Sequence, residues 1–435
     1  MTIEVLAYLS VTFIFLLAFN SVNVPDRFRW SALSPFNFYL FLNFIFFLDF
    51  YFFFQVRDTS FLEQVFYVED SDFYVGFYLF LFGYIALSIG ICSSIYIFDA
   101  RYVNCTTRMH YQEETSDNKS VEKVNRLQFY LILLVSVIIL ILNFKSILLM
   151  IAGDISKQNL FRDERALLFL FTFLPYSAAL AISSTKKVIK KLLIVCLSSI
   201  LMIFTDSRGG VIYMFLLLLY AYNFKYRKIN VIFYLIALPA VAYLLTVLRY
   251  VFRESWRYPS FNSFIEDKGG IFQLFFNSVE ISMAEVITTV IKFSERIPRY
   301  PFESLFAGLT FPFPRNLYEN KPIGGSGVFT SILSPDKWFY TKSEVVISGY
   351  GDFYLNFGFA FSIVLLFFIG LFWSRMIYKY VTSGVAKNLY YVPILMWLMY
   401  TLLRADIFNM MRWGWALIIF NMLVFFFKKL KIKSR

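Results

Sequence analysis

The chain is poor in charged residues, and this shortage excludes a soluble protein. Of its 435 residues, 16% are charged and 59% are hydrophobic, with a mean hydropathy of +0.63. Soluble globular domains are about one-quarter charged. Apolar runs of about twenty residues, long enough to cross a ~30 Å hydrocarbon core, recur along almost the whole length. The sequence therefore predicts an all-α polytopic membrane protein.

Histidine and cysteine are also scarce, which excludes several kinds of site. The chain has 1 histidine and 3 cysteines. His110 falls in a predicted cytoplasmic loop, so a histidine base or a histidine-ligated zinc at the outer face is excluded. Cys92 and Cys196 fall within predicted spans and Cys105 in a cytoplasmic loop, which leaves no disulfide framework and no CxxC metal knuckle. We therefore expect no metal and no cofactor.

About eleven apolar runs are predicted to cross the membrane. They cover residues 5–20, 34–56, 73–98, 127–152, 166–184, 192–205, 210–222, 231–249, 351–373, 388–404 and 413–428. Lysine and arginine concentrate in alternate short connections, among them "KKVIKK" (186–191) and the tail "KKLKIKSR" (428–435), and basic short loops stay cytoplasmic. The N-terminus is therefore predicted outside and the C-terminus inside. The net charge of +12 reflects this inner-face bias, and we do not interpret it as nucleic-acid binding.

This topology divides the chain into three parts. Residues 1–249 form a membrane domain of about eight spans, residues 250–350 a large outer loop, and residues 351–435 the last three spans with a basic tail. Loops as long as the middle part are usually functional. Within it, apolar residues recur at helical spacing over 271–293, which predicts an amphipathic helix that lies on the bilayer surface or packs on the bundle.

The stretch "DSRGG" (206–210) lies between two short predicted spans, which places Arg208 at the outer surface. Its adjacent glycines let a ligand approach the backbone and expose amides at the start of the next helix, where an anion is favoured. The structural alternative is a helix hairpin in which the glycines only make the turn and Arg208 pairs with Asp206.

Basic residues accumulate on the predicted outer side, where they give no topological benefit. They are Arg162, Arg165, Arg208, Arg249, Arg253, Arg257, Arg299, Arg315, Lys321, Arg404 and Arg412. Each one alone is explained by snorkelling or solvation. As a set they indicate an anionic ligand, because the arginine fork is always charged and matches phosphate oxygens in pairs. A diphosphate at the outer membrane face fits this set.

Two charges lie within predicted spans at a similar depth. They are Asp49, in "FFLDFYFF", and Lys145, in "LNFKSILL". A structural ion pair between them is the favoured interpretation, with a place in a polar cavity as the alternative.

Three motifs occur in register around the long outer loop. They are "DSRGG" (206–210), "FPFPRNLYENKP" (311–322) and "SGYGDFYLNFGFAFSIVLLFFIGLF" (348–372). Together they resemble the O-antigen polymerase (Wzy) family, also called oligosaccharide repeat unit polymerases, and the resemblance covers nearly the whole chain. The family often has glutamate where Asp352 stands, and "GFAF" replaces a more usual glycine-rich continuation.

The resemblance implies a fold similar to that of multi-span, lipid-carrier-dependent glycosyltransferases. It also implies that the protein joins O-antigen repeat units on undecaprenyl diphosphate at the periplasmic face of a Gram-negative inner membrane, with a chain-length-regulating co-polymerase as a partner. The growing glycan would move from its carrier to the non-reducing end of the next lipid-linked unit.

Such chemistry needs positive charge where the diphosphate leaves and a base for the acceptor hydroxyl. We expect Arg208 and Arg315 to stabilise the leaving group, and Asp352 to act as the base, ahead of Glu344 and Asp206. The alternative for Asp352 is an N-cap of the ninth span. The expected diphosphate-binding residues are Arg249, Arg253, Lys321, Arg162, Arg165 and Arg404.

Other functions stay open. An O-antigen ligase is expected to use an outer-face histidine, which this chain lacks. A metal-dependent glycosyltransferase could bind its ion at Glu69, Asp70 and Asp72, although an exposed acidic loop is the simpler interpretation. A flippase of lipid-linked sugar should carry charges in both halves of its spans and an internal two-fold repeat. The unusual features here gather on one face, which favours chemistry at a surface.

Overall fold

The structure is a computed structural model, and not every residue is described. The described residues are 2–21, 30–56, 69–106, 117–145, 148, 171–185, 187–204, 208–225, 228–233, 239–240, 243–244, 246–247, 250–251, 255, 258–267, 270–271, 282–297, 302–313, 318, 320–336, 338–339, 344–381 and 385–433.

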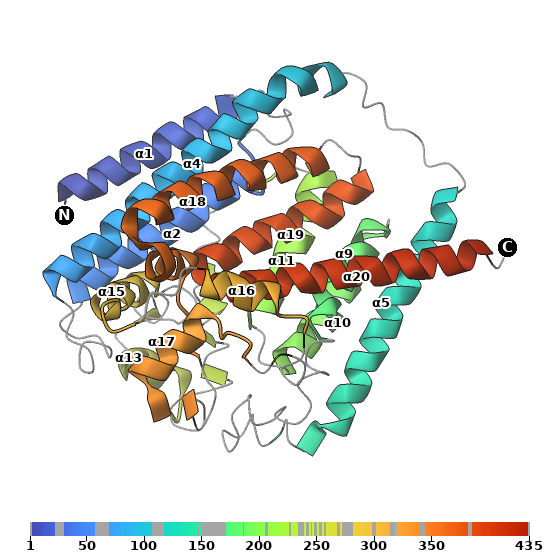
Figure 1. Cartoon of the computed structure of the whole chain (residues 1–435). Coiled ribbons are helices and arrows are strands. Elements are labelled where there is room, and N and C mark those ends of the chain that lie inside the picture. The colour runs from blue at the N-terminus through green and yellow to red at the C-terminus, as the bar shows by residue number, and fades with distance from the viewer. Residues whose placement is uncertain are drawn as a thin grey trace. The chain divides into compact units, whose positions relative to one another are not determined.

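Over these residues the fold is helical, with one isolated β-bridge between Ser31 and Asn230. The helices, labelled in Figure 1, are α1 (Thr2–Ser21), α2 (Pro35–Val56), α4 (Asp70–Thr106), α5 (Asp117–Leu142), α9 (Phe173–Ser183), α10 (Val188–Phe204), α11 (Arg208–Lys225), α13 (Phe261–Asp267), α15 (Met283–Phe293), α16 (Glu303–Leu309), α17 (Gly325–Leu333), α18 (Gly349–Val381), α19 (Val385–Arg404) and α20 (Ile407–Lys433).

Six of the described helices are long and apolar enough to cross a membrane. Their apolar stretches are Glu4–Ser21, Pro35–Phe54, Asp70–Ile95, Asn125–Leu142, Gly349–Val381 and Ile407–Phe426. They match the first four, the ninth and the eleventh of the predicted spans. The chain is therefore a multi-pass helical membrane protein whose apolar helices suit a lipid bilayer.

The other five predicted spans are not among these six stretches. Helices α9, α10 and α11 have 11, 17 and 18 residues, and α19 has 20 residues with a proline inside it. Most of the predicted span 231–249 lies outside the described residues. A total of about eleven spans stays a prediction.

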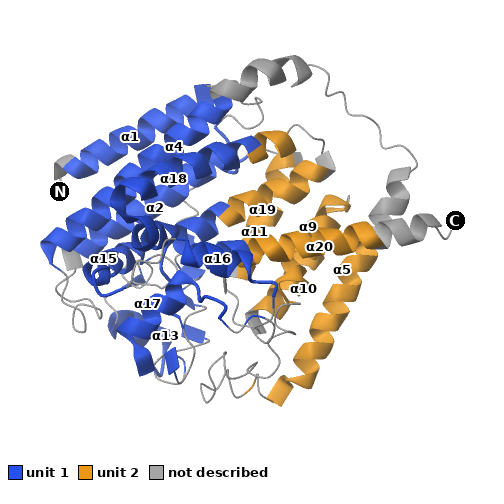
Figure 2. Ribbon diagram, in the orientation of Figure 1, with its two compact units in different colours: residues 1–98, 229–375, 399–411 blue, residues 99–228, 376–398, 412–435 orange. Residues whose placement is uncertain are grey.

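The chain forms two compact units, shown in Figure 2. Unit 1 comprises residues 1–98, 229–375 and 399–411, and unit 2 comprises residues 99–228, 376–398 and 412–435. Each unit thus combines segments that are distant in the sequence.

In unit 1, α2 packs against both α1 and α15. The rings of Tyr8 and Phe47 stack with their centroids 3.7 Å apart. Helices α4 and α18 can approach closely because Gly90 and Gly370 have no side chain. A side chain at either position would collide with the backbone of the opposite helix. Small residues of this kind allow direct backbone contact between membrane helices.

In unit 2, helices α5, α9, α10 and α11 pack together. Helix α10 ends at Phe204 and α11 begins at Arg208, and the two are in contact. The Asn125 side-chain amide donates to the Ser184 hydroxyl over 2.8 Å, and the Tyr220 hydroxyl donates to Asn388 over 2.7 Å. Buried polar groups of this unit are therefore linked across its helices.

The predicted amphipathic helix over 271–293 is described from residue 283 onward as α15. It packs on α2, and Ile287 and Thr288 lie against the α4 backbone at Gly76. Asp49, buried in α2, accepts a 2.7 Å hydrogen bond from the backbone amide of Ala284 in the first turn of α15. Lys145, the partner predicted for Asp49, is exposed. A helix N-terminus therefore stabilises the Asp49 carboxylate.

Candidate functional site

The third motif forms the first part of α18, which is kinked at Gly358. This glycine has φ 74° and ψ −175°, a left-handed conformation that other residues rarely adopt. The kink separates a short helix at 349–357 from the longer part at 359–381. At ~1.5 Å per residue the longer part is roughly 34 Å long, enough to cross the bilayer by itself. Asp352 therefore lies in a short helix that precedes the spanning part.

Asp352 is fully buried and accepts hydrogen bonds from three groups. The Ser304 hydroxyl donates to it over 2.6 Å and the Asn356 side-chain amide over 2.9 Å. The backbone amide of Ile407, the first residue of α20, donates over 2.9 Å. Asp352 thus connects the first turns of α16 and α20 to α18.

The N-cap position of α18 belongs to a different residue. The Ser348 hydroxyl accepts a 3.1 Å hydrogen bond from the Gly351 amide, and the Ser348 carbonyl accepts the amide of Asp352 over 2.9 Å. The N-cap alternative considered for Asp352 therefore describes Ser348, because the carboxylate of Asp352 is turned toward other helices.

A second buried aspartate, Asp406, directly precedes Ile407, whose amide donates to Asp352. It accepts a 2.9 Å hydrogen bond from the Ser326 amide at the start of α17 and another of 2.9 Å from the Asn409 amide in the first turn of α20. The Asn409 side chain also donates to it over 2.7 Å. We call Asp352, Asp406 and their donors Ser304, Ser326, Asn356, Ile407 and Asn409 the aspartate hub.

Gly324 and Gly325, which precede Ser326, allow the start of α17 to pack closely against Phe408 and Asp352. A side chain at Gly325 would collide with the Asp352 carboxylate, and one at Gly324 would approach the Phe408 Cβ to 2.7 Å. The segment "IGGSG" (323–327) therefore needs glycine where the backbone of α17 meets α18 and α20.

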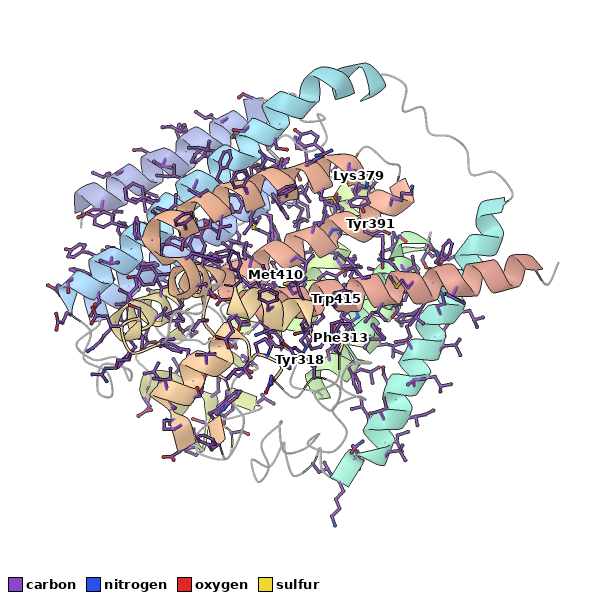
Figure 3. All side chains as sticks on the ribbon, viewed as in Figure 1. Phe313, Tyr318, Lys379, Tyr391, Met410 and Trp415 are labelled. Carbon is purple, nitrogen blue, oxygen red and sulfur yellow. The ribbon has the colours of Figure 1, made fainter. Side chains whose placement is uncertain are left out.

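The second motif folds onto itself through Lys321. Its ammonium donates to the carbonyls of Phe311 and Phe313, each over 2.9 Å, and lies 5.5 Å from the centre of the Phe311 ring. The Phe311 ring meets Phe408 of α20 edge-on with centroids 5.8 Å apart. Figure 3 labels Phe313 and Tyr318 in this segment, and both are exposed. The second motif thus contacts α20 at the residue between Ile407 and Asn409 of the aspartate hub.

The other predicted site residues are less completely described. Arg404, the last residue of α19, is partly buried and precedes Asp406 by two positions. Arg208 begins α11, but its side chain lies outside the described residues. Arg162, Arg165, Arg249, Arg253, Arg315 and Asp206 also lie outside them. The site is therefore built here from the hub and the Lys321 segment.

The remaining carboxylates near the hub are partly buried. Glu303 begins α16, and burial raises the pKa of its carboxyl. Glu344, the second choice for a base, lies close to the position that a side chain at Gly327 would occupy.

The acidic group considered as a metal site forms a helix start instead. The Asp72 carboxylate accepts a 3.4 Å hydrogen bond from the Glu69 amide, and the Phe73 amide donates to the Glu69 carbonyl over 3.1 Å. An N3 side chain that reaches back to the N-cap amide in this way is one half of a capping box. In the part of the chain that the structure describes, no group of three or more histidine, cysteine, aspartate or glutamate residues is arranged to hold a metal.

Sequence reasoning selected Asp352 and missed Asp406, Ser304 and Asn356. Two local signals were present. Asn356 follows Asp352 by four residues, which places both on one helix face. Asp406 directly precedes α20, where aspartate is a favoured cap. Comparisons with protein-family models, curated proteins and solved structures found no match for the chain.

Proposed function

We propose that this protein is an O-antigen repeat unit polymerase. It would be a glycosyltransferase of the Gram-negative inner membrane, with a periplasmic N-terminus, a cytoplasmic C-terminus and its site at the periplasmic face. One observation carries the proposal: the first turn of α20 contacts the second motif, where Phe408 meets Phe311, and also the third motif, where the Ile407 amide donates to the buried Asp352 carboxylate. Sites held on helices by packed and hydrogen-bonded side chains keep a precise geometry.

The proposed reaction transfers the growing glycan between two lipid carriers. The bond between the glycan's anomeric carbon and the undecaprenyl diphosphate oxygen breaks, and the diphosphate leaves as an anion. A hydroxyl at the non-reducing end of the next lipid-linked unit forms the new glycosidic bond, and its proton passes to a base. Arg208 and Arg315 would stabilise the leaving diphosphate.

The remaining basic residues would bind the diphosphates of donor and acceptor. They are Arg162, Arg165, Arg249, Arg253, Lys321 and Arg404. Lys321 already holds two backbone carbonyls, so we assign it first to shaping the segment 311–321.

The proposed base role of Asp352 carries a structural condition. Its carboxylate is buried and already accepts three hydrogen bonds. Oδ1 has two donors and Oδ2 has one, so an acceptor hydroxyl would bind at Oδ2, and the groups that bury this oxygen would have to move aside. Holding three helices together is the role that its contacts support directly.

The first test is complementation of a strain deleted for the gene, with lipopolysaccharide analysed on a gel. Wild type should restore a ladder of chain lengths. Arg208→Ala should leave only a single-repeat band at matched membrane abundance, because export and ligation continue while joining stops. Lys190→Ala, which removes an exposed charge on the predicted cytoplasmic side, is the matched control and should keep the ladder.

Two results would overturn the proposal in different ways. A deletion strain that exports no repeat unit would favour a flippase of lipid-linked sugar. A deletion strain that exports polymer but does not attach it to lipid A would favour a ligase. A full ladder from Arg208→Ala would remove Arg208 from the site and leave "DSRGG" as a structural turn.

A further inference from the structure

Helix α16 has its small residues inside and its large apolar residues outside. Its buried residues are Ser304, Ala307 and Gly308. The exposed fractions are 48% for Phe302, 57% for Phe306 and 43% for Leu309. We call these last three residues the outer apolar face of α16.

Phe306 and Leu309 lie on one side of the helix, because they are three positions apart. Phe302 is the N-cap residue, with a left-handed φ of 70°, and its ring is placed by its contact with Phe357. A helix that packs on a water-soluble body shows the opposite pattern, with its large apolar residues turned inward. Phe313, just after α16, is exposed by 57% as well, so the apolar surface continues beyond the helix.

The inner side of α16 is tied to unit 1 at two points. Ser304 donates to Asp352 over 2.6 Å, and the α16 backbone at Gly308 packs on Met411 of α20. These contacts fix the orientation of α16 and leave the outer apolar face turned away from the unit.

The outer apolar face also continues onto the spanning part of α18. The Phe302 ring meets the Phe357 ring edge-on with centroids 4.9 Å apart, directly before the Gly358 kink. One turn beyond that contact, Phe361 is exposed by 68%. Helix α18 is apolar enough to cross a membrane, and its part after the kink, residues 359–381, is long enough to do so. The exposed side of this span faces lipid, and α16 extends that surface at its outer end.

We propose that α16 is an interfacial helix whose outer apolar face is buried among the acyl chains of the outer leaflet. The occupant of this face is bilayer hydrocarbon because the face is continuous with the lipid-exposed side of a spanning helix. Glu303 then lies at the headgroup level. This proposal rests on the membrane character of the chain and is independent of the proposed enzymatic function.

The proposal has a consequence for the aspartate hub. Ser304 and Phe306 lie on opposite sides of the same short helix, so the bilayer holds one side while Asp352 holds the other. The hub is thereby fixed at the boundary between hydrocarbon and water, where a lipid-linked diphosphate has its headgroup.

Spin labelling of the full-length protein tests this placement. The three natural cysteines are replaced by serine, and a nitroxide is attached at Phe306→Cys or Leu309→Cys in phosphatidylethanolamine and phosphatidylglycerol vesicles. Collision rates are measured with oxygen, which concentrates in hydrocarbon, and with a nickel chelate, which stays in water. Phe361→Cys is the lipid-facing control, and Asp336→Cys, on an exposed position after α17, is the aqueous control.

The expected ratio of oxygen to nickel collisions at positions 306 and 309 is severalfold above that at 336 and close to that at 361. A ratio equal to that at 336 would overturn the proposal, because the face would then lie in water. Protection from both reagents would also overturn it, because a protein surface or a second copy would then cover the face. Substitution at two exposed positions keeps the test independent of one variant's folding.

Discussion

Three buried aspartates in unit 1 share one kind of partner, a backbone amide in the first turns of a helix. Asp49 binds the start of α15, Asp352 the start of α20, and Asp406 the starts of both α17 and α20. Burying a carboxylate without such donors is very costly. The positive end of the helix dipole and its unpaired amides offset that cost. In this unit buried aspartate side chains therefore join helix ends to other helices.

Asp406→Asn should destabilise the protein. The asparagine oxygen can replace only one carboxylate oxygen, and its NH2 group would face either the Ser326 or the Asn409 amide. An unsatisfied buried donor costs ~1–3 kcal/mol. We expect a lower melting temperature in detergent, measured by the change in tryptophan fluorescence on heating, because Trp373 and Trp397 are buried.

Asp336→Asn is the control for that change, because Asp336 is exposed. Equal melting temperatures for the two variants would contradict the hub as a source of stability.

Gly358→Ala should destabilise the kink of α18. A residue with a side chain at this positive φ and extended ψ costs ~1–3 kcal/mol, and a straightened α18 would separate Phe357 from Phe302. Gly414→Ala in α20 is the matched control, because a side chain there meets nothing within 4 Å. Thermal unfolding in detergent measures both, and a loss no larger for Gly358→Ala than for Gly414→Ala would argue against the kink.

At the scale of the element, the long apolar helices were predictable and the short ones were not. Runs of apolar residues predicted α1, α2, α4, α5, α18 and α20. Helices α1 and α2 begin and end within three residues of the predicted spans, whereas the other four extend beyond the predicted spans at one end or both. Helix α18 runs eight residues beyond the predicted end of its span, because the charged Arg375 and Lys379 continue the helix past the apolar run. An apolar run predicts the part of a helix that crosses the hydrocarbon, but the helix itself can continue into charged residues beyond that part.

The short helices α13, α16 and α17 had no such signal. Helix α16 in particular has seven residues, and its large apolar side chains point outward. The spacing of the apolar residues is compatible with a helix, but it would suggest that the large apolar side chains are buried, whereas they are exposed. The packing partners of such a segment depend on residues far along the chain.

The hub was only partly predictable for the same reason. Asp352 could be selected from its motif, but its donors Ser304 and Ile407 lie 48 and 55 residues away. The donor Ser326 lies 80 residues from Asp406. No local pattern connects residues at these separations, so the sequence indicated candidate groups without their pairing.

Ser304→Ala should loosen α16 without unfolding the unit. It removes the side-chain hydrogen bond from α16 to Asp352, for which we expect a loss of ~1 kcal/mol. Hydrogen exchange should then speed up in residues 303–309. Ser331→Ala is the control, because the Ser331 hydroxyl bonds only to a carbonyl of its own helix, that of Val328. Unchanged exchange in α16 would show that its outer side, rather than Ser304, fixes the helix.

At the scale of the whole molecule, exposed apolar residues dominate the surfaces of several long helices. Leu6 and Phe13 of α1 are exposed by 64% and 60%, and Ile141 and Leu142 of α5 by 67% and 76%. Soluble proteins rarely expose contiguous apolar patches of this kind. These surfaces are suited to lipid, and the polar networks of each unit are buried between its helices instead.

The aspartate hub also bears on the order of biogenesis. The ribosome makes Asp352 well before Ile407, and Ser326 well before Asp406. Until α20 has entered the membrane, the Asp352 carboxylate lacks one of its three donors and the Ser326 amide of α17 lacks its acceptor. Unpaired polar groups at this location are what membrane chaperones and proteases encounter in a nascent chain. Insertion of α20 is thus the step that completes the hydrogen bonds of Asp352 and Ser326, after which chaperones and proteases no longer meet these unpaired groups.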